Sequence, residues 1–120
     1  MATILLVDDL QFIKKMEKAA LENHGHTIVG DASDGEQAIE LYRQTRADVV
    51  LMDITMPKMN GLDAMMHILE INKKAKVIIC SALDNQHVLI KAVKAGASEY
   101  LVKPYTMEKL VHTIEKVINA

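Results

Sequence analysis

Five short apolar runs recur along the chain, and each is bounded by polar or turn-forming residues. They span residues 3–7, 27–30, 48–52, 76–80 and 99–102, and β-branched residues dominate several of them. The runs show little of the alternation between apolar and polar residues that marks a strand with one solvated face. Runs of this length and kind are typical of strands covered on both faces, as in parallel sheets.

The segments between these runs carry apolar residues at helical spacing. The first segment ends at residues 23–25, where Gly25 can adopt the left-handed conformation that closes many helices. The last segment has an apolar stripe opposite a polar face, which is typical of an amphipathic helix. The spaced apolar residues are Phe12, Ile13, Met16, Ala20 and Leu21 in the first segment, and Leu110, Val111, Ile114, Val117 and Ile118 in the last.

Polar residues at the starts of the later helical segments are candidate N-caps. Ser33 stands three residues before Glu36, a capping-box pattern that predicts a helix over 37–44. Gly96 can stop the fourth helix. The other expected caps are Asn60 for a helix to about residue 71, Asp84 for a helix to residue 95, and Thr106 for the last helix.

The order of elements is therefore strand then helix, five times. Alternation of this kind implies right-handed crossovers between parallel strands, with helices on both faces of the sheet. A chain of 120 residues is too short for an eight-unit barrel, so the fold class expected is α/β, with an open, doubly wound, five-stranded parallel sheet. The length also fits one domain spanning residues 1–120.

Composition and charge argue against several classes of partner. The net charge of −2 gives no basic footprint for nucleic acid or for an anionic membrane. No apolar stretch approaches the ~20 residues of a membrane span, and aspartates interrupt the apolar start of the chain too early for a signal peptide. The single cysteine, Cys80, cannot form an internal disulfide, which favours a reducing compartment. We expect a cytoplasmic protein.

Polar side chains that can bind an ion or take part in a reaction follow four of the five strands. Any one of them is equally well explained as a turn residue, a cap or a solvated surface group. Together they are more informative, because ligands of open α/β sheets bind beyond the carboxyl ends of the strands. The residues are Asp8 and Asp9 after the first strand, Asp53 after the third, Ser81 after the fourth and Lys103 after the fifth.

The chemistry that needs this set of groups is narrow. Clustered carboxylates repel one another and call for a cation, and an oxygen-only ligand set favours a hard ion such as Mg²⁺. A lysine and a hydroxyl are suitable donors to phosphoryl oxygens, and an aspartate can itself accept a phosphoryl group as an acyl phosphate. No glycine-rich phosphate loop follows the first strand, so neither a P-loop nor a flavin phosphate site is indicated.

Four segments carry a resemblance to a known family: ILLVDD, DVVLMDITMPKMNG, VIICSA and YLVKPY. In order and spacing they resemble the signatures of two-component response-regulator receiver domains, over essentially the whole chain. Within that family the chain is similar to stand-alone receivers of the chemotaxis type (CheY-like). The resemblance implies a flavodoxin-like sheet with strand order 2-1-3-4-5.

The resemblance also implies roles for individual residues. Asp53 matches the phosphoacceptor of the family, and Lys103 matches the lysine that contacts the phosphoryl group. Asp8, Asp9 and Asp53, together with the backbone carbonyl of Thr55, match the ligands of Mg²⁺. Asp9 and Asp53 match the direct carboxylate ligands of the ion.

Two further residues match the switch elements of the family. Ser81 matches the switch hydroxyl and Tyr100 the switch aromatic, whose inward rotation follows phosphorylation. The peptide bond before Pro104 matches one that is often cis in the family.

The function implied is a phosphorylation-activated signalling switch rather than an enzyme with its own substrate, although phosphorylation and autodephosphorylation would be self-catalysed. A histidine kinase would donate the phosphoryl group to Asp53. The output would be a protein contact, with a flagellar motor switch component or a phosphotransfer protein as the target. We expect a monomer that binds neither nucleic acid nor membrane.

Three alternatives stay open on the residues alone. The chain could be a phosphorelay shuttle receiver, or a pseudo-receiver that only binds partners. It could also be a Mg²⁺-dependent phosphatase with an aspartyl-phosphate intermediate. Against the phosphatase, Thr55 stands where a general acid two residues after Asp53 would be needed.

Overall fold

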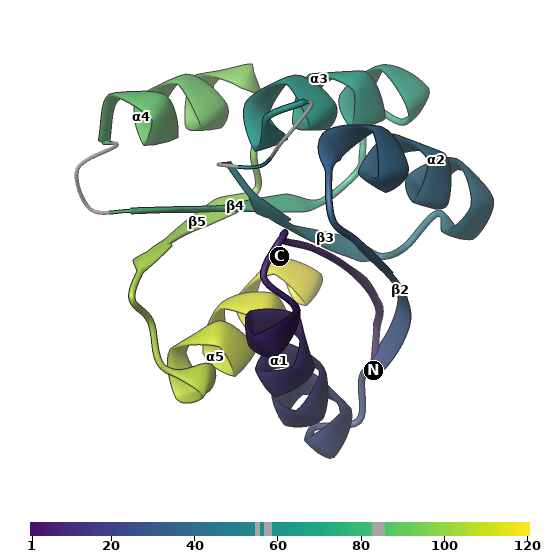
Figure 1. Cartoon of the computed structure of the whole chain (residues 1–120), viewed down its shortest axis with the longest axis vertical. Coiled ribbons are helices and arrows are strands. Elements are labelled where there is room, and N and C mark those ends of the chain that lie inside the picture. The colour runs from purple at the N-terminus through teal and green to yellow at the C-terminus, as the bar shows by residue number, and fades with distance from the viewer. Residues whose placement is uncertain (55, 57–58, 83–85) are drawn as a thin grey trace.

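Five parallel strands form one sheet in the order β2-β1-β3-β4-β5 (Figure 1). The structure is a computed structural model, and it describes residues 1–54, 56, 59–82 and 86–120. The order of the strands confirms the expected doubly wound α/β fold. The strands are β1 (Thr3–Val7), β2 (Thr27–Ala32), β3 (Val49–Asp53), β4 (Val77–Ala82) and β5 (Glu99–Lys103).

A helix follows each strand, and the helices cover both faces of the sheet. Figure 1 shows α2, α3 and α4 on one face and α1 and α5 on the other. Within the described part of the chain, no helix is long and apolar enough to cross a membrane. The helices are α1 (Gln11–Asn23), α2 (Gly35–Thr45), α3 (Gly61–Ile71), α4 (Gln86–Ala95) and α5 (Met107–Ile118).

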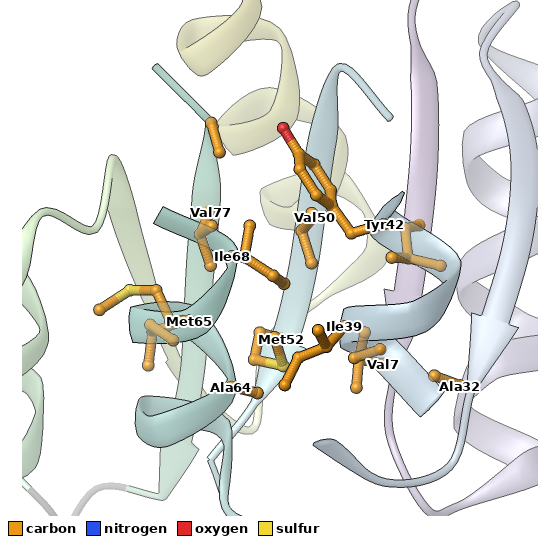
Figure 2. Close-up of a cluster of buried hydrophobic side chains, with 14 of the residues drawn as sticks. Val7, Ala32, Ile39, Tyr42, Val50, Met52, Ala64, Met65, Ile68 and Val77 are labelled. Atoms are coloured by element: carbon orange, nitrogen blue, oxygen red, sulfur yellow. The ribbon is translucent and has the colours of Figure 1, made fainter. Parts of the chain in front are cut away.

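Each face of the sheet has its own hydrophobic core, because successive side chains of a strand point to opposite faces. In β1, Leu5 and Val7 pack with α2 and α3, whereas Ile4 and Leu6 pack with α1 and α5. Figure 2 shows the first of these cores, which includes Met52 of β3 and Ile68 of α3. The uninterrupted apolar runs in the sequence are therefore explained by two covered faces.

The helix caps are partly as the sequence predicts. The Asn60 side chain accepts a hydrogen bond from the Asp63 amide, and Thr106 caps α5 in the same way. The Ser33 prediction is wrong, because Asp34 caps α2 by accepting from the amide of Gln37. A carboxylate one residue later reaches the free amide of the first turn better than the shorter hydroxyl does. The cap predicted at residue 84 lies outside the described residues.

Helix α1 forms where its apolar spacing predicts, but its buried face is different. Phe12 is 71% exposed and Met16 is 40% exposed. The charged residues Lys14 and Glu17 are buried instead. Buried charges need partners, so this face of α1 points toward polar groups of other segments.

Gly61 brings the start of α3 against the backbone of the last residue of β3. Its amide donates a hydrogen bond of 2.8 Å to the Ile54 carbonyl. A Cβ added to Gly61 would overlap the carbonyl oxygen of Asp53 and lie 2.9 Å from the Ile54 Cα. The lack of a side chain at Gly61 therefore allows the start of α3 to lie close to the end of β3.

We expect Gly61→Ala to lower the free energy of unfolding by about 1–3 kcal/mol, because the new methyl group meets backbone that cannot move cheaply. Urea denaturation followed by far-UV circular dichroism measures this change. The matched control is Gly30→Ala, whose Cβ would meet its nearest atom, in the Leu5 side chain, at an ordinary 3.4 Å. Equal stability of the two variants would contradict the steric argument.

Candidate acidic site at the carboxyl edge of the sheet

Three aspartates meet where β1 and β3 end side by side. Val7 pairs with Met52 across the two strands, so the residues that follow them, Asp8 and Asp53, are neighbours. Asp8, Asp9 and Asp53 each place a carboxylate oxygen within 4.8 Å of the others. Asp8 is 3% exposed and Asp53 is 6% exposed, while Asp9 is exposed to solvent. Burial with this spacing concentrates negative charge at one point of the sheet edge.

The Lys103 ammonium reaches this cluster from the far edge strand. Its Nζ lies 3.2 Å from Asp53 Oδ1 and 3.5 Å from Asp8 Oδ2. Partial burial disfavours the charged lysine, but the charges of Asp53 and Asp8 outweigh that effect and raise the pKa of Lys103 above its ordinary value. Lys103 therefore stays protonated and offsets part of the negative charge. Its peptide bond to Pro104 is cis, as the resemblance implies.

Backbone and side-chain contacts hold Asp8 in place. Its Oδ1 accepts a 2.9 Å hydrogen bond from the Leu10 amide, and its own amide donates to the Ala32 carbonyl at 3.0 Å. The buried Lys14 ammonium donates to the same Ala32 carbonyl at 3.2 Å and to the Ser33 hydroxyl at 3.1 Å. Lys14 of α1 and the backbone of Asp8 are thus both hydrogen-bonded to the end of β2. Nothing in the local sequence pattern marks Lys14 as buried, so its place beside the site could not be predicted from the sequence.

The two expected switch residues occupy different environments. Ser81 is buried at the end of β4, and its hydroxyl donates to the Ala82 carbonyl at 3.4 Å. Tyr100 is 44% exposed in β5. It borders a groove of about 530 Å³, and the other lining residues among those that the structure describes are Leu89, Ile90, Val93, Lys94 and Val102. Thr55, the expected carbonyl ligand, lies outside the described residues.

A second buried polar cluster lies close to the acidic site. The Tyr105 hydroxyl donates a 2.6 Å hydrogen bond to Glu17 Oε2, and its oxygen lies 3.7 Å from the Cys80 Sγ. Burial raises the pKa of Glu17 to about 7, which the Tyr105 hydrogen bond opposes and the charge of Asp8 reinforces. Burial also raises the pKa values of the Cys80 thiol and of the Tyr105 hydroxyl. No sequence pattern predicts the Glu17–Tyr105 pair, because its two members are 88 positions apart in the chain.

The donor set of the acidic site fits a hard divalent cation. Asp8, Asp9 and Asp53 offer oxygen ligands only, which Mg²⁺ prefers, and few protein ligands leave room for water and phosphate oxygens. Among the residues that the structure describes, the Lys103 ammonium faces two of the three carboxylates, Asp8 and Asp53. The residues present therefore fit a magnesium ion.

The fold and the site together define a class of protein. A parallel sheet of order 2-1-3-4-5 reverses its strand order between β1 and β3, and proteins of this doubly wound class bind ligands at that point. The sequence profile of the response regulator receiver domain matches residues 4–115. The chain belongs to this family, whose members are signalling proteins of two-component systems that bind Mg²⁺ in an acidic pocket.

Individual relatives agree with this family. The chemotaxis protein CheY of Thermotoga maritima is 42% identical over 114 residues, which cover 95% of each chain. Protein CcdB of Bacillus subtilis is 41% identical over 119 residues, which cover 99% of each chain. Among solved structures, the CheX-CheY-BeF3-Mg complex of Borrelia burgdorferi matches with a TM-score of 0.91 at 34% identity, covering 96% of this chain and 87% of that one.

The raised pKa of Glu17 makes stability depend on pH. The ordinary pKa is 4.5, so the folded protein holds this proton more tightly, and the resulting stabilisation is lost as the pH rises toward about 7. Glu17→Gln cannot ionise. The unfolding free energy of this variant, relative to wild type, should rise by about 2–3 kcal/mol from about pH 5 to about pH 8.

Urea denaturation at a series of pH values measures that difference. The matched control is Glu22→Gln, which alters an exposed glutamate of the same helix and should keep a constant offset from wild type. A constant offset for Glu17→Gln as well would show that Glu17 titrates normally.

Proposed function

We propose that this receiver domain is a phosphorylation-controlled switch that accepts a phosphoryl group on Asp53. We also propose that residues 1–120 form a single domain. The observation that carries the proposal is the contact of Lys103 with Asp53 inside a cluster of three carboxylates. An ammonium in that place can pair with phosphoryl oxygens as they arrive, and the adjacent carboxylate can attack phosphorus.

The transfer is a simple displacement at phosphorus. An Oδ atom of Asp53 attacks, the new O–P bond forms, and the P–N bond of a donor phosphohistidine breaks. The electron pair of the broken bond stays on the donor imidazole, which takes up a proton. Lys103 stabilises the negative charge of the phosphoryl oxygens during this step. Later attack by water releases inorganic phosphate and returns the electron pair to the Asp53 carboxylate.

The ligands for Mg²⁺ would be Asp8, Asp9 and Asp53, together with the Thr55 carbonyl inferred from the family. When bound, the ion supplies positive charge against the phosphoryl oxygens. The chain's own groups do the remaining work: the Leu10 amide orients Asp8, and Lys103 holds Asp53 facing the donor.

The output would be a change of surface rather than a reaction. Ser81 would turn its hydroxyl from the Ala82 carbonyl toward the phosphoryl group, and Tyr100 would move inward from its exposed position. Such a change is a shift between two populated states, biased by the new charge. The groove beside Tyr100 would alter its shape accordingly.

A histidine kinase is the proposed phosphodonor, and a protein is the proposed target. Chemotaxis, with a flagellar motor switch component as the target, is favoured by the likeness to the CheY of Thermotoga maritima. A phosphorelay with a phosphotransfer protein as the target is the alternative, because the residues of the acidic site would serve either output. We propose a monomer in the cytoplasm, where the Cys80 thiol stays reduced.

Asp53→Asn should abolish labelling by acetyl phosphate, because the amide is not a competent nucleophile. Intact-protein mass spectrometry in millimolar Mg²⁺ detects the added phosphoryl group. The matched control is Asp63→Asn, which alters an exposed aspartate in the first turn of α3 and should label as wild type does. Stoichiometric labelling of Asp53→Asn would overturn the proposal, and rapid release of phosphate over many turnovers would favour a phosphatase instead.

Addition of Mg²⁺ should shift the amide NMR signals around Asp8, Asp9 and Asp53, a method suited to a chain with no tryptophan. Asp9→Asn should raise the dissociation constant at least about tenfold, since it removes one of three charged ligands. The Asp63→Asn control should bind Mg²⁺ as wild type does. Amide signals of the wild-type protein that do not shift when Mg²⁺ is added would indicate a pseudo-receiver.

A further inference from the structure

A buried carboxylate, Glu17, accepts a short hydrogen bond from the phenol of Tyr105. The Tyr105 oxygen lies 2.6 Å from Glu17 Oε2, although the two residues are 88 positions apart in the chain. Glu17 is 2% exposed, so water does not offer this carboxylate a comparable partner. Neither residue has a role in the phosphoryl chemistry described above.

This hydrogen bond joins the two segments that supply opposite charges to the acidic site. Helix α1 begins at Gln11, directly after the loop that carries Asp8 and Asp9, and Glu17 lies on its buried face. Tyr105 lies two residues after Lys103 and directly before the N-cap of α5. Helices α1 and α5 pack against each other on one face of the sheet (Figure 1). The Glu17–Tyr105 hydrogen bond therefore connects α1, which follows Asp8 and Asp9, to the segment that follows Lys103.

Lys103 needs such support more than the aspartates do. Its side chain is long and flexible, and it is 29% exposed. Its ammonium must nevertheless stay near both Asp53 and Asp8, and small displacements of a catalytic group reduce rates strongly. Fixing the phenol of Tyr105 to α1 restrains the backbone from which Lys103 projects.

We propose that Glu17 is a positioning residue for phosphoryl acceptance, acting through the Tyr105 hydroxyl to hold Lys103 against Asp53. This inference rests on the proposed function. An apolar pair at these two positions would pack without the cost of burying a carboxylate, so the polar pair is a feature that a purely structural role does not require.

The test removes the hydrogen bond from either end. Glu17→Leu and Tyr105→Phe should each lower the limiting rate of Asp53 labelling by acetyl phosphate about five- to tenfold, the size expected from one hydrogen bond. The double variant should be no slower than the slower single variant, because both changes remove the same contact. Glu17→Gln, whose amide oxygen still accepts from the phenol, should label within about twofold of wild type.

Two readouts separate positioning from general loosening. The dissociation constant of Mg²⁺, measured by NMR, should stay within about twofold of wild type, because the aspartate ligands are untouched. The matched control is Tyr42→Phe, which removes a phenol that accepts a hydrogen bond from Asn72 in the other core and should label normally. A parallel loss of Mg²⁺ affinity in Tyr105→Phe would overturn the positioning role.

Wild-type labelling rates in folded Glu17→Leu and Tyr105→Phe would also overturn it. Should Glu17→Leu fail to fold, Tyr105→Phe and Glu17→Gln decide the matter, since Tyr105→Phe removes a single oxygen. Asp53→Asn belongs in the same assay. If Asp53→Asn is still labelled, the proposed function fails, whereas an unlabelled Asp53→Asn beside normal rates in the other variants overturns the positioning role alone.

Discussion

Three carboxylates crowded at one edge of the sheet are the constraint on which the rest of this structure depends. Like charges at this separation repel, and the burial of Asp8 and Asp53 removes water that would screen them. The Lys103 ammonium offsets part of that repulsion by contacting both. Because Lys103 comes from the far edge strand, β4 and β5 must keep their register for the contact to exist.

The architecture supplies that register from both faces. Two separate cores clamp the sheet, one against α2, α3 and α4 and the other against α1 and α5. Local devices then hold the loops at the carboxyl edge. Gly61 allows the start of α3 to lie against the backbone of Asp53, and the Leu10 amide donates a hydrogen bond to a carboxylate oxygen of Asp8. Contacts thus position the charged groups of the site, whereas the side chain of Tyr100 in β5 is exposed to solvent.

The places where sequence reasoning failed have a common cause. The apolar spacing of α1 predicts a helix correctly, yet Phe12 faces solvent while Lys14 and Glu17 are buried. Lys14 is paired with the Asp31 carboxylate and donates to the Ala32 carbonyl and the Ser33 hydroxyl at the end of β2. Glu17 accepts from the phenol of Tyr105, which lies 88 positions away. Hydrophobic periodicity cannot reveal such pairs, because it measures the helix alone and not the surface on which the helix packs.

The sequence by itself determined the alternation of strands and helices, the caps at Asn60 and Thr106, and the set of polar residues at strand ends. Those features follow from local periodicity and from the chemistry of single residues. Only the tertiary structure decided that Lys103 contacts Asp53, and that Glu17 meets Tyr105. Both contacts join segments far apart in the chain, so their existence depends on how the strands are ordered and how the helices pack on the sheet, which no local pattern encodes.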